Sequence, residues 1–315
     1  MKNLFRIKSL ALIAFVAILS ISCDDDDPAP VVDNTITAKA VASPNLSILV
    51  QALTKAKLAG TLQGAGPFTV FAPTNAAFEK YLADNKIASL DAIPTDKLKQ
   101  ILLNHVVSGK VLSTQLTTGY IKTEATFGTT TSKISMYVNT ATTPGTKLLN
   151  GVANVSTPNV EASNGVIHIV DAVIDVPTIV THAVANASFS TLASVLTAQG
   201  LIPTLSGTVS SPFTVFAPLN SAFNPATLEL YGGLSSDNKS AVLKHHVVTG
   251  LNVLSSAIPT TPIPTFQGQN ISIAGIVITD GSGGKSNIVV SAVDVQCGNG
   301  VIHAIDKVLL PNLAD

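Results

Sequence analysis

Charged side chains are scarce in this sequence. Only 12% of its 315 residues are Asp, Glu, Lys or Arg, whereas 46% are hydrophobic. This balance excludes a disordered chain, which would be rich in charge and poor in apolar residues. It also disfavours a helical bundle, whose exposed faces need many Glu and Lys residues. Frequent Thr, Val, Ala, Ser and Gly indicate β-rich structure instead, and the length suits about two domains.

Arginine is almost absent, because Arg6 is the only one in the chain. Setting aside residues 1–22 removes three of the 18 basic residues and no acidic one. This leaves 15 basic against 19 acidic residues and a net charge of −4. Nucleic-acid binding depends on Lys and Arg that neutralise phosphates, with Arg supplying the bidentate contacts. The composition therefore excludes nucleic acid as a partner.

One of the two cysteines, Cys23, stands at the end of an N-terminal apolar segment. This segment, Leu10–Ile21, follows three basic residues and has the layout of a secretory signal peptide. It is short for a transmembrane helix, which needs about 20 residues. A small residue before cysteine resembles a bacterial lipoprotein signal, in which the cysteine is acylated, for example with palmitate. We predict a lipoprotein signal peptide over residues 1–22 and a lipid anchor on Cys23; the alternative is a plain secreted protein.

An acidic run, Asp24–Asp27, follows Cys23 and precedes a segment rich in Pro and Thr. It is similar to the surface-export tether of lipoproteins from Bacteroidetes-type bacteria. We therefore expect a tether over residues 23–40 and an outer-membrane location, lipid-anchored and facing the cell exterior. If Cys23 is lipidated, Cys297 has no partner for an intrachain disulfide.

The remaining sequence contains a tandem duplication, because three blocks occur twice in the same order. These pairs are Phe68–Pro73 and Phe213–Pro218, His105–Gly109 and His246–Gly250, and Asn164–His168 and Asn299–His303. The two units are predicted to span residues 41–176 and 177–315, and each is long enough to be a domain.

Helical patterns precede β-like patterns in each unit. In the first unit, Ser43 is the expected N-cap of a helix whose apolar face runs from Leu46 to Ala56 and which Gly60 ends. Thr74 and Thr95 are the expected caps of two further helices. Strands are expected at Phe68–Ala72, Ile121–Phe127, Ile134–Val138, Val152–Val155 and Val166–Val176. The predicted fold class is α+β.

The segments 68–78 and 164–174 resemble the two signature blocks of fasciclin (FAS1) domains, and the His-Val-Val-x-Gly segment between them resembles the central segment of that family. The resemblance occurs in both units. It implies two tandem modules, each a wedge-shaped β-sandwich with packed helices, that act in adhesion without catalysis. The central Tyr-His pair of the family is Asn104-His105 in the first unit and His245-His246 in the second. This departure weakens any transfer of receptor contacts from animal relatives.

The six histidines are the candidates for catalysis or metal binding. His105 and His246 lie on apolar helix faces, and the predicted role is structural. His168 and His303 each precede an Asp by three residues, which on a strand places the two side chains on opposite faces. With Asn164 and Asn299 they are predicted to be structural motif residues.

No catalytic residue, cofactor or metal site is expected. His182 and His245 have no zinc-site spacing. The Gly281–Gly284 segment lies between two expected strands, which predicts a hairpin loop and not a phosphate-binding loop. Cys297 corresponds to Ala162 and is predicted to be a small apolar residue. A Ser–His–Asp triad assembled in space stays open as a minor alternative.

Two functions fit these observations. The first is a cell-surface adhesion or interaction protein whose partner is an extracellular polysaccharide or a matrix or surface protein. The alternative is a glycan- or small-ligand-binding outer-membrane lipoprotein associated with nutrient uptake. The chain has no tryptophan to stack on sugars, so an exposed cluster among Tyr81, Tyr120, Tyr137 and Tyr231 would favour the alternative. A pocket joining a serine to His168 or His303 would indicate a hydrolase.

We expect Cys23→Ala to move the protein from the membrane fraction to the soluble fraction, because the variant would lack the thiol that carries the acyl chains. Cell fractionation followed by immunoblotting measures this. A Cys297→Ala variant is the control and should stay with the membrane. Membrane retention of Cys23→Ala would show that the lipoprotein prediction is wrong.

Overall fold

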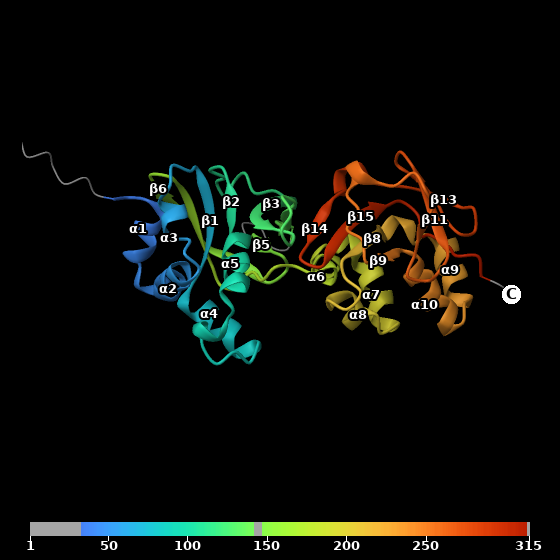
Figure 1. Cartoon of the computed structure of the whole chain (residues 1–315), viewed down its shortest axis with the longest axis horizontal. Coiled ribbons are helices and arrows are strands. Elements are labelled where there is room, and N and C mark those ends of the chain that lie inside the picture. Colours follow the sequence, from blue (N-terminus) through green and yellow to red (C-terminus); the bar gives the residue numbers. More distant parts are fainter. Residues whose placement is uncertain (1–32, 142–146, 314–315) are drawn as a thin grey trace, which may run out of the picture. The chain divides into compact units, whose positions relative to one another are not determined.

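The computed structural model describes residues 33–141 and 147–313 (Figure 1). Two segments with a similar order of elements follow one another, and we name them module 1 (residues 34–176) and module 2 (residues 177–313). The predicted signal peptide, Cys23 and the Asp24–Asp27 run lie outside the described residues. Both modules place short helices before most of their strands, and the predicted α+β class is confirmed.

The described part of module 1, residues 34–141 and 147–176, contains five α-helices and seven strands. Its helices are α1 (Ile36–Val41), α2 (Ser47–Lys55), α3 (Ala59–Gln63), α4 (Asn75–Asp84) and α5 (Thr95–Asn104), with 3-10 turns η1 (Pro44–Leu46) and η2 (Leu90–Ala92). Its strands are β1 (Phe68–Pro73), β2 (Val106–Ser108), β3 (Gly119–Thr126), β4 (Lys133–Asn139), β5 (Leu148–Leu149), β6 (Ala153–Ala162) and β7 (Gly165–Val170).

Module 2 repeats this order from its first helix. Its helices are α6 (Ile179–Ala185), α7 (Ser190–Ala198), α8 (Ile202–Ser206), α9 (Pro225–Gly233) and α10 (Ser236–His245), with 3-10 turns η3 (Ala187–Phe189), η4 (Asn220–Ala222), η5 (Ser255–Ala257) and η6 (Val290–Ala292). Its strands are β8 (Phe213–Pro218), β9 (Val247–Thr249), β10 (Ile263–Pro264), β11 (Asn270–Ala274), β12 (Val277–Thr279), β13 (Lys285–Asn287), β14 (Val295–Cys297) and β15 (Gly300–Ile305).

The first and last of the three repeated blocks form a parallel strand pair in each module. In module 1, β1 lies beside β7, with Phe68 opposite Gly165 and Phe71 opposite His168. In module 2, β8 pairs with β15 in the same register, with Phe213 opposite Gly300. All other strand pairs among the described residues are antiparallel. The duplication in the sequence is therefore also a duplication of strand pairing.

The strands of each module form two layers. In module 1 the strand order is β2-β1-β7-β6-β5-β4-β3, and β6 changes register twice as it passes from the β7 layer to the β5 layer. Module 2 has separate sheets in the orders β14-β15-β8-β9 and β10-β11-β12-β13.

Each module has two apolar cores, one on each face of the sheet that contains the parallel pair. Val70 and Ala72 of β1 face the helices, whereas Phe71 faces the second layer of strands. Because this strand is buried on both faces, it is apolar at every position except Thr69 and does not alternate. Phe216 of β8 occupies the corresponding place between the two sheets of module 2. Tyr120 is an exception to the separation of modules, because it belongs to module 1 and packs against the helical core of module 2.

The predicted tether ends earlier than expected. Residues 36–41 form α1, in which Ile36 and Ala40 are buried, and Thr35 caps this helix by accepting from the Ala38 N–H. The helix is amphipathic but short, so its apolar residues did not show a periodic pattern in the sequence. The boundary at Ala40 was therefore wrong.

Of the predicted helix caps, Ser43 is confirmed only in position and Thr95 is wrong. Ser43 is the N-cap residue of η1 with Pro44 after it, but its hydroxyl donates to the Lys39 carbonyl oxygen and caps no N–H group. Thr95 lies inside α5, whose N-cap residue is Pro94. The cap of α2 comes from Asn75, whose Oδ1 accepts from the Ile48 N–H at 2.9 Å. In module 2, Asn220 Oδ1 accepts from the Thr191 N–H at the start of α7. Thr74 caps α4 as predicted. A cap supplied from a residue distant in sequence leaves no local signal.

Several predicted boundaries of elements differ from the structure. The α2 helix ends at Lys55, and Gly60 lies inside α3 instead of ending a helix. Strand β7 ends at Val170, well before Val176. The Gly281–Gly284 segment connects β12 to β13, so the predicted hairpin is confirmed, although the expected strand after it is mostly the turn η6.

Within residues 33–141 and 147–313, no single helix is long and apolar enough to cross a membrane. One pair of segments, Ile179–Ala185 and Ala187–Ala198, has the length and composition but is bent by 100°.

We expect Gly165→Ala to destabilise module 1 by about 2 kcal/mol or more, because the new Cβ forces two strands apart. An ideal Cβ at Gly165 would lie 1.9 Å from the Phe68 carbonyl oxygen. Gly60→Ala is the control, since no atom lies within 4 Å of its Cβ position and alanine favours helix. Urea denaturation compares the two variants. Equal stability of both would contradict the close approach of β1 and β7.

Candidate functional site

A buried asparagine joins three segments at the entry to the last strand of each module. Asn164 Oδ1 accepts from the Ile36 N–H at 2.9 Å, and its Nδ2 donates to the carbonyl oxygens of Leu62 and Gly64 at 2.7 and 2.8 Å. The Asn164 carbonyl accepts from the Phe68 N–H. The amide therefore satisfies backbone groups at the start of α1 and the end of α3, which would otherwise lack partners.

Asn299 makes the same set of contacts in module 2. Its Oδ1 accepts from the Ile179 N–H at 3.0 Å, and its Nδ2 donates to the Leu205 and Gly207 carbonyl oxygens. Its own carbonyl accepts from the Phe213 N–H. Both side chains are buried, at 7% and 5% exposure for Asn164 and Asn299, so none of their polar atoms is left for a ligand.

The histidine at the end of α5 connects that helix to the segment after β7. His105 Nδ1 lies 2.8 Å from the Ile101 carbonyl oxygen, and the Ile174 N–H donates to Nε2 at 2.9 Å. Because a carbonyl only accepts and an amide N–H only donates, the proton is on Nδ1. Burial lowers the pKa of His105 from 6.5 to about 4. The ring is therefore neutral at pH 7.

His246 repeats this arrangement at the end of α10. Its Nδ1 lies 2.8 Å from the Val242 carbonyl oxygen, and its Nε2 accepts from the Leu309 N–H. Burial lowers its pKa to about 4 as well. Each ring thus bridges a helix end and the segment that leaves the last strand.

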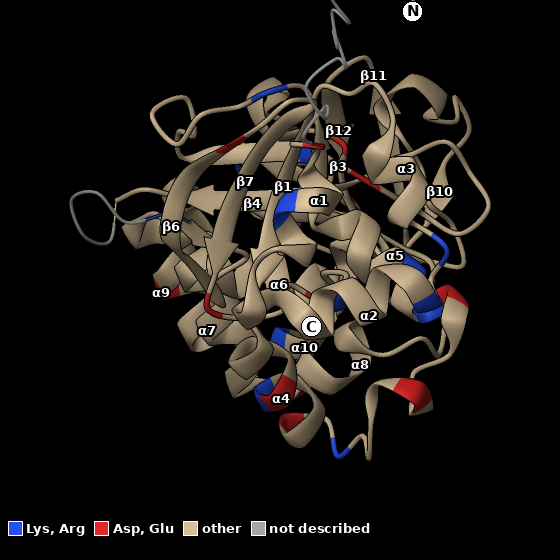
Figure 2. Ribbon diagram, turned by 90° about the vertical axis from the view of Figure 1, so that its left-hand side faces the viewer, with Lys and Arg blue, Asp and Glu red and all other residues tan. Residues whose placement is uncertain are grey.

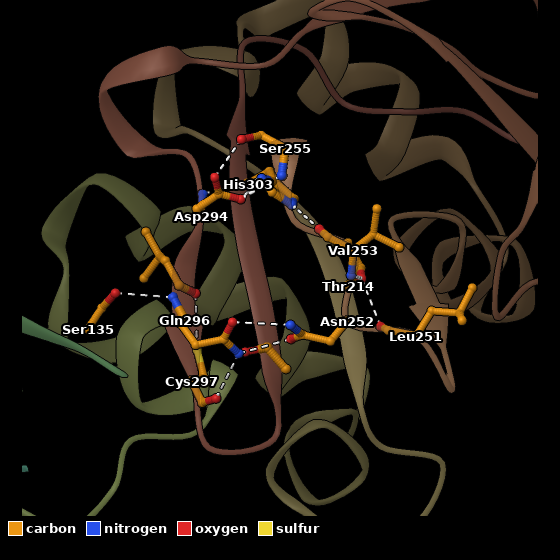
Figure 3. Close-up of polar contacts among 12 residues, drawn as sticks. Ser135, Thr214, Leu251, Asn252, Val253, Ser255, Asp294, Gln296, Cys297 and His303 are labelled. Carbon is orange, nitrogen blue, oxygen red and sulfur yellow. Dashed lines mark hydrogen bonds and ion pairs between the residues drawn. The ribbon is translucent and has the colours of Figure 1, made fainter. Parts of the chain in front are cut away.

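The histidines of the parallel strand pairs bind loop backbone. His168 Nε2 lies 2.9 Å from the Val111 carbonyl oxygen, and its Nδ1 accepts from the Asn159 N–H. His303 contacts the Val253 carbonyl oxygen and the Asp294 N–H in the same way (Figure 3). The rings stack on Phe71 and Phe216, with centroids 5.4 and 5.6 Å apart.

A serine and an acid lie beside His303, but they do not form a catalytic triad. Ser255 donates its hydroxyl to Asp294 and not to the imidazole, and both imidazole nitrogens contact backbone groups (Figure 3). A general base must reach the proton that it removes. In module 1 the same place is held by Asn159, which accepts from the Ser113 N–H and donates to its hydroxyl. The amide of Asn159 in module 1 thus contacts a serine as the carboxylate of Asp294 does in module 2. Since an uncharged amide serves equally well, the arrangement orders a loop.

The positions that depart from the family's central Tyr-His pair are also engaged. Asn104 Nδ2 donates to the carbonyl oxygens of Ile174 and Asp175, and its Oδ1 accepts from the Thr123 hydroxyl. His245 lies 3.2 Å from the Thr265 hydroxyl and accepts from the Gly281 N–H. Both side chains thus connect the helix to later loops.

Metal ligands do not gather in the part of the chain that the structure describes, where no group of three or more His, Cys, Asp or Glu could hold an ion. Cys297 is fully buried, and burial raises the pKa of its thiol, so it is not positioned as a nucleophile. The buried thiol and the histidines described above are therefore held by structural contacts. The remaining features are the junction between the modules and the surface beside it.

Side chains of β3 and β4 meet β14 and α6 at this junction. Lys122 Nζ donates to the Ser135 hydroxyl at 2.9 Å and to the Asp294 carbonyl oxygen at 2.8 Å. The Ser135 hydroxyl oxygen also accepts from the Gln296 N–H (Figure 3). Since β14 is the edge strand of its sheet, Ser135 satisfies an edge amide that would otherwise be open.

A groove of about 490 Å³ lies along the same junction. Its walls include Asn139, Leu148, Asn150 and Val152 from module 1 and Thr181 and Val184 from module 2. Val152 and Val184 are 53% and 65% exposed, and none of the described residues that line the groove is charged. Figure 2 shows that acidic and basic residues are sparse and mixed along the ribbon. The groove is thus a neutral surface with exposed apolar side chains.

The tyrosines do not form an exposed cluster. Tyr81 is buried and donates to Asp175, and Tyr137 is buried beside Tyr120 with ring centroids 5.1 Å apart. Tyr120 packs against module 2, and Tyr231 lies on α9 with Lys239 Nζ over its ring, 5.9 Å from the centroid. These rings offer no platform on which a sugar could stack.

Comparison with known proteins gives one family. The model of the Fasciclin domain matches residues 44–177 and 187–311. Protein sll1483 from Synechocystis is 39% identical over 140 residues, which cover 42% of this chain and 73% of that protein. The pig transforming growth factor-beta-induced protein ig-h3 is 28% identical over 82% of this chain, which spans only 37% of that protein. The cell surface glycolipoprotein MPB83 of Mycobacterium bovis is 30% identical over 42% of this chain and 60% of that protein.

Among solved structures, a FAS1 domain pair from the insect cell adhesion molecule Fasciclin I is similar. It is 20% identical, with a TM-score of 0.47, over 88% of this chain and 96% of that chain.

We expect His105→Ala to destabilise module 1 and His246→Ala to destabilise module 2, each by about 2–4 kcal/mol. Each change leaves a cavity and two unpaired backbone groups, while the core clusters of the two modules share no buried residue. Calorimetry should show one weakened transition in each variant, so the two variants serve as controls for each other. EDTA should change neither. A variant that melts like the parent but loses a bound metal would contradict the structural role.

Proposed function

Because the chain belongs to the fasciclin domain family, we propose that it is a cell-surface adhesion or interaction protein with two non-catalytic modules on a lipid anchor. FAS1 domains occur in cell adhesion proteins and in surface glycolipoproteins. The anchor would be the acylated Cys23, at the outer membrane and facing the exterior. The signal-like segment and the acidic run that follows it support this location.

The observation that carries the proposal is the neutral groove between the modules. Its walls come from both modules, and two exposed valines face solvent beside Thr and Asn side chains. An uncharged, partly apolar surface suits a protein partner whose contact is apolar at its centre and polar at its rim. A matrix or surface protein is therefore the preferred partner, and an extracellular polysaccharide is the second, since the tyrosines give no stacking platform.

Non-catalytic action is supported by the histidines. His105, His168, His246 and His303 each use both ring nitrogens on backbone groups. If one of these imidazoles gained or lost a proton in catalysis, it would lose a hydrogen bond that holds a loop or a helix end. Weak binding at each copy would be strengthened if several anchored copies contact one repetitive partner.

We expect Val184→Glu to weaken binding to the partner at least tenfold, because it places a charge in a neutral groove. The purified full chain is first probed on an array of matrix proteins and glycans, and the strongest hit is then titrated with the variant. Val290→Glu is the control, since Val290 is 69% exposed, much like Val184, and does not line the groove. Equal losses in both variants, or none in Val184→Glu, would show that the groove is not the binding surface.

A further inference from the structure

His182 is a fully buried histidine that makes no hydrogen bond of ordinary geometry. It lies on α6 with 0% exposure, and neither ring nitrogen has a hydrogen-bond partner among the described residues. Buried polar side chains are usually paired, and an unpaired one has a cost in free energy. The other five histidines all contact polar groups. His182 therefore differs from the others in its surroundings.

The ring is covered by module 1. Tyr120 of β3 meets it edge-on, with ring centroids 5.2 Å apart and planes at 85°, and the Tyr120 hydroxyl accepts from Asn186 Nδ2 at 3.1 Å. On the other side of the contact, Gly151 lies against Ala185, so that a Cβ at Gly151 would be 3.2 Å from the Ala185 Cβ. The contact between the two modules therefore excludes solvent from the imidazole.

The charges around His182 oppose its protonation. Lys122 of β3 is the charged group whose field acts on the ring, and it disfavours a second positive charge. The Ser135 backbone on β4 lies outside hydrogen-bonding geometry, yet it favours the protonated ring more strongly than Lys122 opposes it, and burial outweighs both. Tyr120, Tyr137 of β4 and Cys297 of β14 are neutral in acid, because burial raises the pKa of each.

Asp294, which precedes β14, is the acidic group of the junction. Its carboxylate accepts from the Ser255 N–H and hydroxyl, and its carbonyl oxygen accepts from Lys122. It therefore does not pair with the imidazole of His182. Apart from His182, α6 itself has no titratable side chain.

We propose that protonation of His182 favours opening of the contact between the two modules, so that the junction opens more readily in mild acid than at neutral pH. Opening exposes the His182 ring to solvent and moves the ring away from Lys122. It also separates the two walls of the groove, while each module keeps its own core.

The linkage between proton binding and opening gives the direction and the size of the change in the ratio of closed to open molecules. Burial lowers the pKa of His182 from 6.5 to about 3 in the closed junction, whereas an open junction restores a value near 6.5. Above pH 6.5 the ring is neutral in both states and has no effect. As the pH falls below 6.5, the open state binds the proton first, and the ratio of closed to open molecules drops by about 30-fold at pH 5.

Hydrogen exchange of the full chain between pH 7.5 and pH 5 tests the proposal. The amide of Gln296, which donates to Ser135 across the junction, should lose protection by about 30-fold at pH 5 after correction for intrinsic exchange. The amide of Thr214, on β8 inside module 2, should stay protected. Circular dichroism should stay unchanged, because each module keeps its fold.

His182→Phe keeps an aromatic ring against Tyr120 and cannot be protonated, so its Gln296 amide should stay protected at pH 5. His245→Phe makes the same change away from the junction and should open like the parent. If the parent keeps full protection of Gln296 at pH 5, the proposal fails, and this result needs no variant. It also fails if a folded His182→Phe variant opens as the parent does.

Discussion

A buried asparagine holds three separate segments of each module through its side-chain amide and its backbone carbonyl. The side-chain Oδ1 of Asn164 accepts a hydrogen bond from the first N–H of α1, and its Nδ2 donates to two carbonyl oxygens at the end of α3. Its backbone carbonyl accepts from the first N–H of β1. It stands at the turn into β7, so the final strand is fixed to the earliest helices. Asn299 repeats these contacts. Because α1 and α3 are too short to be stable alone, their position depends on this side chain.

The bridging histidines extend the same principle to the other end of the sheet. His105 and His246 each tie the end of a helix to the segment that leaves the last strand. The last strand of each module is thus fixed by a side chain at both of its ends. A neutral imidazole suits this place, because one nitrogen donates and the other accepts.

Much of the fold was readable because its signals are local. The apolar run at β1 and the cap at Thr74 predicted their elements, and the repeated blocks predicted the duplication. The cap from Asn75 to α2 was not predictable, since the two residues that it joins meet only in the folded module. The helix α1 was missed because six residues are too few for a periodic pattern.

The candidate site was less predictable than the fold. The sequence pointed to His105 and His168 as structural residues, but it gave no sign that Tyr120 packs against the other module. Nor could it show that His182 is buried without partners. Contacts between modules depend on how two complete domains meet, and a single sequence has no local pattern for that.

The parallel pairing of β1 with β7 also governs when the chain can fold. Most of module 1 lies between these strands, so its central sheet closes only after the last strand has been made. Such distant pairing makes folding slow relative to a helical protein of the same length. Under the export proposed above, this delay would be useful, because the segment already synthesised cannot complete its core before it crosses the membrane.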